Sequence, residues 1–168
     1  MPKPLSLPFD PIARADEIWT RRWGRVPSMV AITSIMRAQQ ILLSQVDSVV
    51  KPYGLTFARY EALVLLAFSK EGELPMSKIG ERLMVHPTSV TNAMDRLETQ
   101  GLVRRVADQT DRRRTFAELT TEGQRVLAQA TDAVMAIDFA VVGLDDQQQD
   151  EAFELLRQVR LAAGDFTD

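Results

Sequence analysis

The chain has 168 residues, 45% of them apolar, and a net charge of −3, which suits one globular domain with its own core. It has no cysteine and one histidine, His86, so disulfides and thiol redox sensing are excluded. We expect no metal site of the Cys/His type and no cofactor. No uncharged apolar run approaches the roughly 18 residues of a membrane span. The proline-broken start shows no export signal, so we expect a cytoplasmic protein without a membrane partner.

The net charge is distributed unevenly along the chain. Residues 76–114 hold eight Lys and Arg against five Asp and Glu, a net charge of +3, whereas residues 115–168 hold three against eleven, a net charge of −8. Residues 1–75 carry a net charge of +2. A basic central segment beside an acidic C-terminal part favours a protein that presents one surface to an anionic partner.

A first helix is predicted over residues 10–24, because Asp10-Pro11 is a good helix start and apolar residues follow at near-helical spacing. Its two tryptophans, Trp19 and Trp23, are large apolar side chains that other residues must shield from water. We interpret them as packing on the domain's own core or on a partner subunit rather than as ligand contacts.

A longer helix is predicted over residues 29–50, where apolar residues recur at helical spacing until Lys51-Pro52 ends it. This helix exposes more apolar surface than one neighbour would cover. Thr56 is predicted to cap the next helix, which is apolar nearly all round and therefore central in the fold. A turn with room for one short strand follows at residues 71–75.

Two further helices are predicted next, over residues 77–84 and 87–100. Pro87 suits the first turn of the second one, and Gly101 suits its end. One face of that helix is apolar and is predicted to be buried: Val90, Ala93, Met94 and Leu97. The other face carries short hydrogen-bonding side chains and one cation, which is what a helix needs to meet base edges in a DNA groove: Thr88, Ser89, Thr91, Asn92, Asp95, Arg96 and Thr99.

A hairpin is predicted after this helix, because two short runs rich in β-formers, 102–107 and 115–119, flank a polar tip. The tip holds three consecutive arginines, Arg112, Arg113 and Arg114, whose mutual repulsion favours an anionic partner. A helix followed by such a hairpin is typical of a winged helix-turn-helix.

Two more helices are predicted at the C-terminal end. Thr120 is expected to cap a helix that runs to about Gly143, and Asp145 or Asp146 to cap a last helix that ends near residue 163.

The run from Ser77 to Gly123 resembles the MarR family of transcriptional regulators. The order and spacing of five pieces carry the resemblance: residues 77–83 (SKIGERL), 89–91 (SVT), 95–98 (DRLE), 101–105 (GLVRR) and 111–113 (DRR), closed by 119–123 (LTTEG). Through its helix pattern alone the resemblance extends over roughly residues 29–163.

The resemblance implies a mainly α protein that forms a single domain over residues 1–168. Residues 55–119 would form the winged helix-turn-helix, and residues 29–50 and 120–163 would form dimerisation helices. The helix over residues 10–24 is an addition to this plan. A twofold dimer and a small effector, often aromatic or anionic, are also implied by the family. Arg37, Arg59 and Tyr60 lie in the region where the effector would bind.

The candidate DNA contacts are Thr88, Ser89, Thr91, Asn92, Arg96, Arg112, Arg113 and Arg114. The competing interpretation of the helix residues is a solvated polar helix face. The competing interpretation of the arginines, including Arg104 and Arg105, is that they are ordinary surface cations. By resemblance, Arg113, two residues after Asp111, enters a minor groove, where a narrow groove attracts guanidinium. Asp95 and Asp111 are assigned supporting roles.

Asp95 is unfavourable beside phosphate, so we interpret it as the partner of a wing arginine or of Arg96, which it would orient. His86 precedes Pro87 and is interpreted as a helix-start residue rather than as a pH sensor or a ligand contact.

The sequence thus predicts a homodimeric, sequence-specific DNA-binding regulator, a ligand-responsive repressor that recognises double-stranded DNA at a pseudo-palindromic operator. The alternative is a winged-helix module for protein contacts without specific DNA binding. An enzyme is not expected, because the chain has no histidine pair, no cysteine and no Gly-rich phosphate loop.

Overall fold

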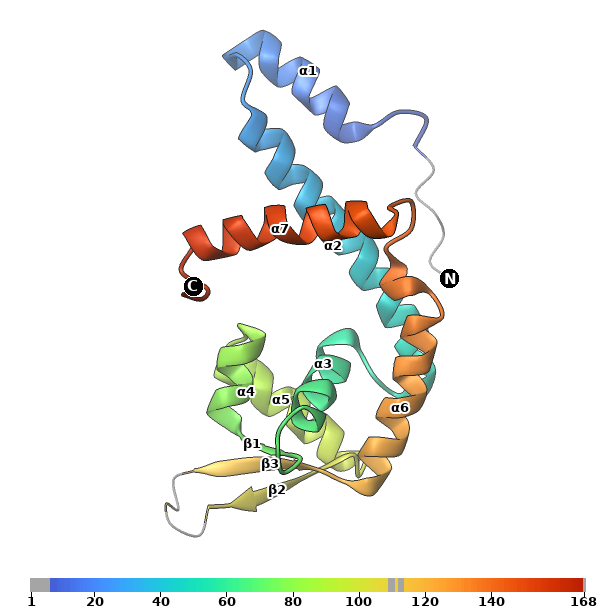
Figure 1. The fold of residues 1–168 in the computed structure, drawn as a ribbon, viewed down its shortest axis with the longest axis vertical. Helices are drawn as coiled ribbons and strands as arrows, with labels where there is room; N and C mark the ends of the chain where they lie inside the picture. Colours follow the sequence, from blue (N-terminus) through green and yellow to red (C-terminus); the bar gives the residue numbers. More distant parts are fainter. Residues whose placement is uncertain (1–6, 109–110, 112–113, 168) are drawn as a thin grey trace.

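The computed structural model describes residues 7–108, 111 and 114–167. Its helices are α1 (Pro11–Trp23), α2 (Pro27–Val50), α3 (Phe57–Ala67), α4 (Met76–Leu83), α5 (Pro87–Thr99), α6 (Thr121–Met135) and α7 (Asp146–Ala162). Two short 3₁₀ helices, η1 (Lys51–Tyr53) and η2 (Asp138–Ala140), and three strands, β1 (Glu73–Pro75), β2 (Val103–Ala107) and β3 (Thr115–Leu119), complete it (Figure 1). The predicted fold class, mainly helical with a winged helix-turn-helix, is confirmed.

The N-terminal helices begin at prolines. Asp10 Oδ1 accepts a hydrogen bond from the Ile12 N–H at 2.8 Å and so caps α1, while α1 ends at Gly24 with a φ of 87°. Helix α2 begins at Pro27, two residues earlier than predicted, because proline fits the first turn of a helix. Among the described elements, α1 packs mainly on α2.

Helix α3 lies at the centre of the core, as its apolar pattern predicted. Tyr60, Ala62, Leu63 and Leu66 are buried. Thr56 holds the predicted N-cap position, but its side chain makes no capping hydrogen bond. Asp47 on α2 supplies the acceptor, since its Oδ1 lies 2.6 Å from the Phe57 nitrogen. The cap therefore ties α3 to α2.

The three strands form one antiparallel sheet in the order β1-β3-β2. Strand β3 pairs Glu118 with Glu73 of β1 and with Arg104 of β2. Helices α3, α4 and α5 pack beside this sheet (Figure 1), and we call this group of elements the lobe. Its core residues with no measurable exposure include Leu63, Leu66, Ile79, Met94, Leu97 and Ala117.

Helix α6 ends eight residues before the predicted Gly143. Thr120 caps its start as predicted, since its Oγ1 accepts from the Gly123 N–H at 2.9 Å. After Met135 the chain turns, and Asp138, Phe139 and Ala140 all have positive φ. Ala140 is 2% exposed, and η2 packs on α2 and α6. Burial of this turn against α2 outweighs the local helical pattern.

Helix α7 forms an arm at the C-terminal end, away from the sheet (Figure 1). Asp145 caps it with a capping box, in which the Gln148 Oε1 accepts a hydrogen bond from the Asp145 backbone N–H at 3.0 Å. No residue of α7 is buried. Among the described residues, no helix is long and apolar enough to cross a membrane.

Candidate nucleic-acid interface

Helix α5 separates an apolar face from a polar one. Val90, Met94 and Leu97 are buried, so they fix the helix against the rest of the lobe. The side chains of the opposite face are exposed, as predicted: Thr88, Ser89, Thr91, Asn92, Asp95, Arg96 and Thr99. A rigidly packed helix that presents short hydrogen-bonding groups to solvent is suited to contact base edges.

His86 caps α5, in agreement with its interpretation as a helix-start residue. Its Nδ1 accepts from the Thr88 N–H at 3.2 Å and lies 3.1 Å from the Thr88 Oγ1. In the neutral ring the accepting Nδ1 carries no proton, so the proton is on Nε2. His86 thereby stabilises the end of α5 that carries Thr88 and Ser89.

Asp95 is paired with Arg105, a residue of the wing strand β2. Arg105 Nη1 lies 2.6 Å from Asp95 Oδ1, and Arg105 Nη2 donates to the Thr91 carbonyl at 3.1 Å. The Arg105 backbone N–H donates to Glu98 Oε1 at 3.0 Å. Of the two partners predicted for Asp95, the structure selects the wing arginine and not Arg96. These bonds hold the base of the wing against α5.

The remaining arginines near α5 differ in their partners. Arg104 Nη2 lies 2.6 Å from Glu118 Oε2 across the β2–β3 pair, and this hydrogen bond raises the pKa of Arg104. Arg96 is exposed and makes no ion pair with another described residue. Arg96 is therefore a cation that the lobe leaves available to an anionic partner.

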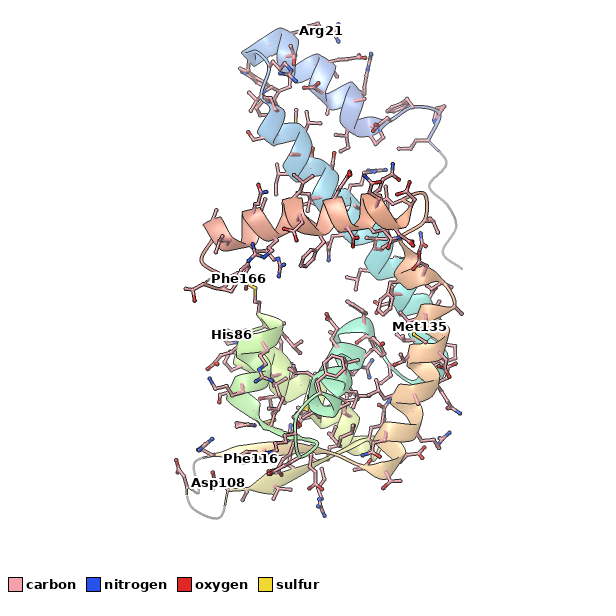
Figure 2. All side chains as sticks on the ribbon, viewed as in Figure 1. Arg21, His86, Asp108, Phe116, Met135 and Phe166 are labelled. Atoms are coloured by element: carbon pink, nitrogen blue, oxygen red, sulfur yellow. The ribbon has the colours of Figure 1, made fainter. Side chains whose placement is uncertain are left out.

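The wing tip is described only in part. Arg112 and Arg113 lie outside the described residues. Arg114 lies 3.6 Å from Asp108 Oδ2, and its guanidinium stands 5.5 Å from the centre of the Phe116 ring. The Arg114 N–H donates to the Asp111 carbonyl at 2.9 Å. Figure 2 shows Asp108 and Phe116 at the outer part of the hairpin, so Arg114 is carried at the wing's distal end.

A hollow of about 390 Å³ lies between α4, α5 and the wing. Its lining is Pro75, Met76, Ser77, Thr91, Arg105, Arg114 and Thr115. It brings together Thr91 and Arg114, which sequence reasoning treated as two separate contacts. It also adds Ser77 and Thr115, which were not predicted as site residues. Three segments far apart in sequence form this surface, and no local spacing could have indicated it.

The three residues placed near the effector by resemblance differ in exposure. Tyr60 is 4% exposed, and its hydroxyl lies 3.2 Å from the Thr131 Oγ1 on α6, so its ring is part of the core. Arg59 is half-buried and donates from Nε to the Thr56 Oγ1 at 3.3 Å. Arg37 is half-buried on α2. None of the three lines the hollow between α5 and the wing.

Comparisons with known proteins agree with this geometry. The model of the MarR family matches residues 53–114. The MarR family transcriptional regulator Sco5413 of Streptomyces coelicolor is 62% identical; the match covers 85% of this chain and 99% of that one, with a TM-score of 0.79.

Two further structures resemble the chain at lower identity. Sco3205 of the same organism, a MarR family transcriptional regulator in complex with DNA, is 29% identical. The match covers 82% of this chain and 88% of the Sco3205 chain, with a TM-score of 0.72. CouR of Rhodococcus jostii RHA1, bound to p-coumaroyl-CoA, is 27% identical. The match covers 80% of this chain and 92% of the CouR chain, with a TM-score of 0.67.

Proposed function

The chain belongs to the MarR family of transcriptional regulators, and on this premise we propose that it binds one operator sequence as a homodimer and represses transcription there. The observation that carries this proposal is the exposed polar face of α5 beside a wing with several arginines. A twofold dimer would place two copies of α5 in successive major grooves, so the operator is a pseudo-palindrome with half-sites about 10 base pairs apart.

We assign base contacts to the first turns of α5. Thr88, Ser89, Thr91 and Asn92 carry hydroxyl and amide groups, and an amide can pair with both polar atoms of an adenine edge in the major groove. Thr91 also lines the hollow beside the wing. These residues would therefore discriminate between operator and random sequence.

We assign backbone and minor-groove contacts to the cations around α5. Arg96 and the wing arginines Arg112, Arg113 and Arg114 would neutralise phosphates, with Arg113 in the minor groove. Asp95 supports this arrangement by holding Arg105, and Asp111 by its backbone bond to Arg114. Affinity from this set should depend strongly on salt and weakly on sequence.

A winged-helix module for protein contacts is less well supported. The polar face of α5 holds no large apolar side chain that would anchor a protein partner, and the relative Sco3205 has been solved in complex with DNA. An enzyme is also less well supported, because the similar proteins are regulators and no group of three or more His, Asp or Glu among the described residues could hold a metal.

We further propose that a small aromatic or anionic effector releases the operator. The support is the resemblance to CouR, whose structure holds p-coumaroyl-CoA. Arg37 and Arg59 are the half-buried cations that would meet an anionic group. The buried Tyr60 would contribute through the packing of α3 on α6. Release of about tenfold needs only about 1.4 kcal/mol of preference for the free dimer.

The test begins with selection of an operator from random duplex DNA, followed by titrations of that operator and a scrambled duplex at two salt concentrations. Asn92→Ala is expected to cost on the order of 1–3 kcal/mol on the operator and little on the scrambled duplex. Arg113→Ala is expected to weaken both and to lower the salt slope by about one unit. Equal losses on both duplexes for Asn92→Ala would exclude α5 as the reading element, and failure to select any operator would exclude the proposed function.

A further inference from the structure

The C-terminal end of α5 is bonded to the segment that joins α2 to α3. Gln100, the C-cap residue of α5, donates from Nε2 to the Gly54 carbonyl oxygen at 3.0 Å, across 46 positions of sequence. Gly54 directly follows η1, which continues from the last turn of α2. This one side chain therefore connects the candidate reading helix to the end of α2.

The backbone at Gly54 passes very close to Gln100. Gly54 has a φ of 73°, in the left-handed region that favours glycine. A Cβ at this position would lie 2.8 Å from the Gln100 Nε2, which is closer than such atoms pack. The Gly54 carbonyl is thus presented to the Gln100 amide by a stretch of backbone that has no room for a side chain.

The segment between α2 and α3 is held on α2 as well. Asp47 Oδ1 accepts from the Phe57 N–H at 2.6 Å, and Val50 and Leu55, at either end of the segment, are 0% and 3% exposed. The segment is therefore a short, packed connection. A bond from α5 to this connection contributes to the angle between α5 and α2.

The same end of α5 is also bonded to the start of α6. Thr120 Oγ1 donates to the Gly101 carbonyl at 2.7 Å. Helices α2 and α6 pack on each other and extend away from the sheet (Figure 1). The C-terminal end of α5 is therefore the point at which this helix meets the two helices that leave the lobe.

The candidate base contacts lie at the opposite end of α5, so a small change of angle is enlarged there. With a rise of 1.5 Å per residue, Thr88 lies about 18 Å along the helix axis from Gln100. A rotation of about 5° at the Gln100 end would move Thr88 by about 1.6 Å. In two copies the movement adds to about 3 Å, close to one base-pair step of about 3.4 Å.

We propose that Gln100 is a positioning residue, whose bond to Gly54 fixes the angle of α5 relative to α2 and thereby the half-site spacing that the dimer accepts. The proposal rests on operator binding by a homodimer, the proposed function. Gln100 contacts no base in this role. It affects specificity through the separation of the two reading helices, so its loss should relax the preference for spacing rather than the preference for bases.

Three full-length variants test this role. Gln100→Leu removes the donor, and Gln100→Lys keeps a nitrogen donor at a similar reach. Gln124→Leu is the matched control on α6, because the Gln124 side chain is exposed and makes no hydrogen bond with another described residue. Each variant is titrated with the selected operator, with operators that have one base pair added or removed between the half-sites, and with a scrambled duplex.

The measured quantity is the ratio of affinities for the selected operator and for the operators of altered spacing. In Gln100→Leu this ratio should fall about fivefold, the effect of losing one hydrogen bond, while binding to the scrambled duplex is unchanged. Gln100→Lys and Gln124→Leu should keep the wild-type ratio, because an added charge affects all duplexes alike. An unchanged ratio in Gln100→Leu, or an equal loss on every duplex, would overturn the proposal.

The distance between the two lobes gives a second readout that needs no operator. The chain has no cysteine, so Arg82→Cys, at an exposed position of α4, carries a single spin label per subunit. Helix α4 packs on α5, and electron spin resonance measures the distance between the labels in the free dimer. The distance distribution should broaden in Gln100→Leu and match wild type in the other two variants. A distribution as narrow as wild type in Gln100→Leu would contradict the role of Gln100. If no operator can be selected, the proposed function fails, and this measurement still decides the role of Gln100.

Discussion

Asp95 Oδ1 lies 2.6 Å from Nη1 of Arg105, and this ion pair joins the outer face of α5 to strand β2. The Arg105 side chain is 27% exposed, against 52% for Asp95. Arg105 also donates to the Thr91 carbonyl and, through its backbone, to Glu98. The wing and the candidate reading helix are therefore coupled directly, without a residue from the core between them.

Asp95→Asn is expected to weaken operator binding about fivefold, close to the 1 kcal/mol that a partly exposed ion pair contributes. The physical reason is that the wing loses one of the bonds that orient it on α5. Titration of operator DNA measures the effect. Glu118→Gln is the matched control, because it removes a wing carboxylate that contacts Arg104 and not α5. Stronger binding by Asp95→Asn would mean that Asp95 acts only by repelling phosphate.

Periodicity predicted most of the helices and the buried stripe of α5, because a packed helix needs apolar residues at every third or fourth position. It could not predict the cap of α3, since the acceptor is Asp47, ten residues earlier on another helix. Periodicity also predicted a longer α6 than the structure has. The apolar pattern continues after Met135, but the chain leaves the helix there, and Ala140 is buried in a turn that packs on α2 and α6.

The site was predictable in its parts and not in their arrangement. The polar face of α5 and the arginines of the wing follow from residue types and spacing. The contact of Thr91 with Arg105, and the hollow that both share with Arg114 and Ser77, depend on how β1, α4 and the wing meet. β1 and α4 reach the wing through the pairing of β3 with the distant strand β1, which local patterns do not encode.

Gly123→Ala is expected to destabilise the protein by about 3 kcal/mol, at the upper end for overpacking. A Cβ at Gly123 would overlap the Leu102 carbonyl oxygen and would lie 2.8 Å from the Leu119 Cδ1. The backbone oxygen cannot move aside without shifting the start of β2. Urea unfolding measures the change. Gly80→Ala is the control within another helix: its Cβ would meet the Val90 Cγ2 at 3.2 Å, a contact that a side chain can relax. Equal losses in both variants would contradict the close approach of α6 to β2.

Glu61→Gln is expected to stabilise the protein at neutral pH and to have no effect in acid. Burial raises the pKa of Glu61 above its ordinary value of 4.5, so the folded state binds its proton more tightly than the unfolded state does. The contribution of Glu61 to the free energy of unfolding is therefore fully present below pH 4.5 and is lost as pH rises through the pKa of the folded state. Thermal unfolding of both proteins across this range measures the difference, with the exposed Glu71→Gln as control. A gain that persists unchanged in acid would rule out desolvation as the cause.

Asp138→Gly is expected to be more stable than Asp138→Ala by about 1 kcal/mol, because Asp138 has a φ of 47° and a left-handed conformation costs a residue with a Cβ roughly 1–2 kcal/mol. Both variants lose the 3.3 Å bond from Gln149 to Asp138 equally, so the comparison isolates the backbone. At the exposed Ala128 inside α6 the order should reverse, and Ala128→Gly should destabilise by about 1 kcal/mol. Chemical unfolding of the three variants and the wild type gives both differences. If Asp138→Ala were the more stable of its pair, α6 would continue through this position as a regular helix, and the turn that directs the chain into α7 would lie elsewhere.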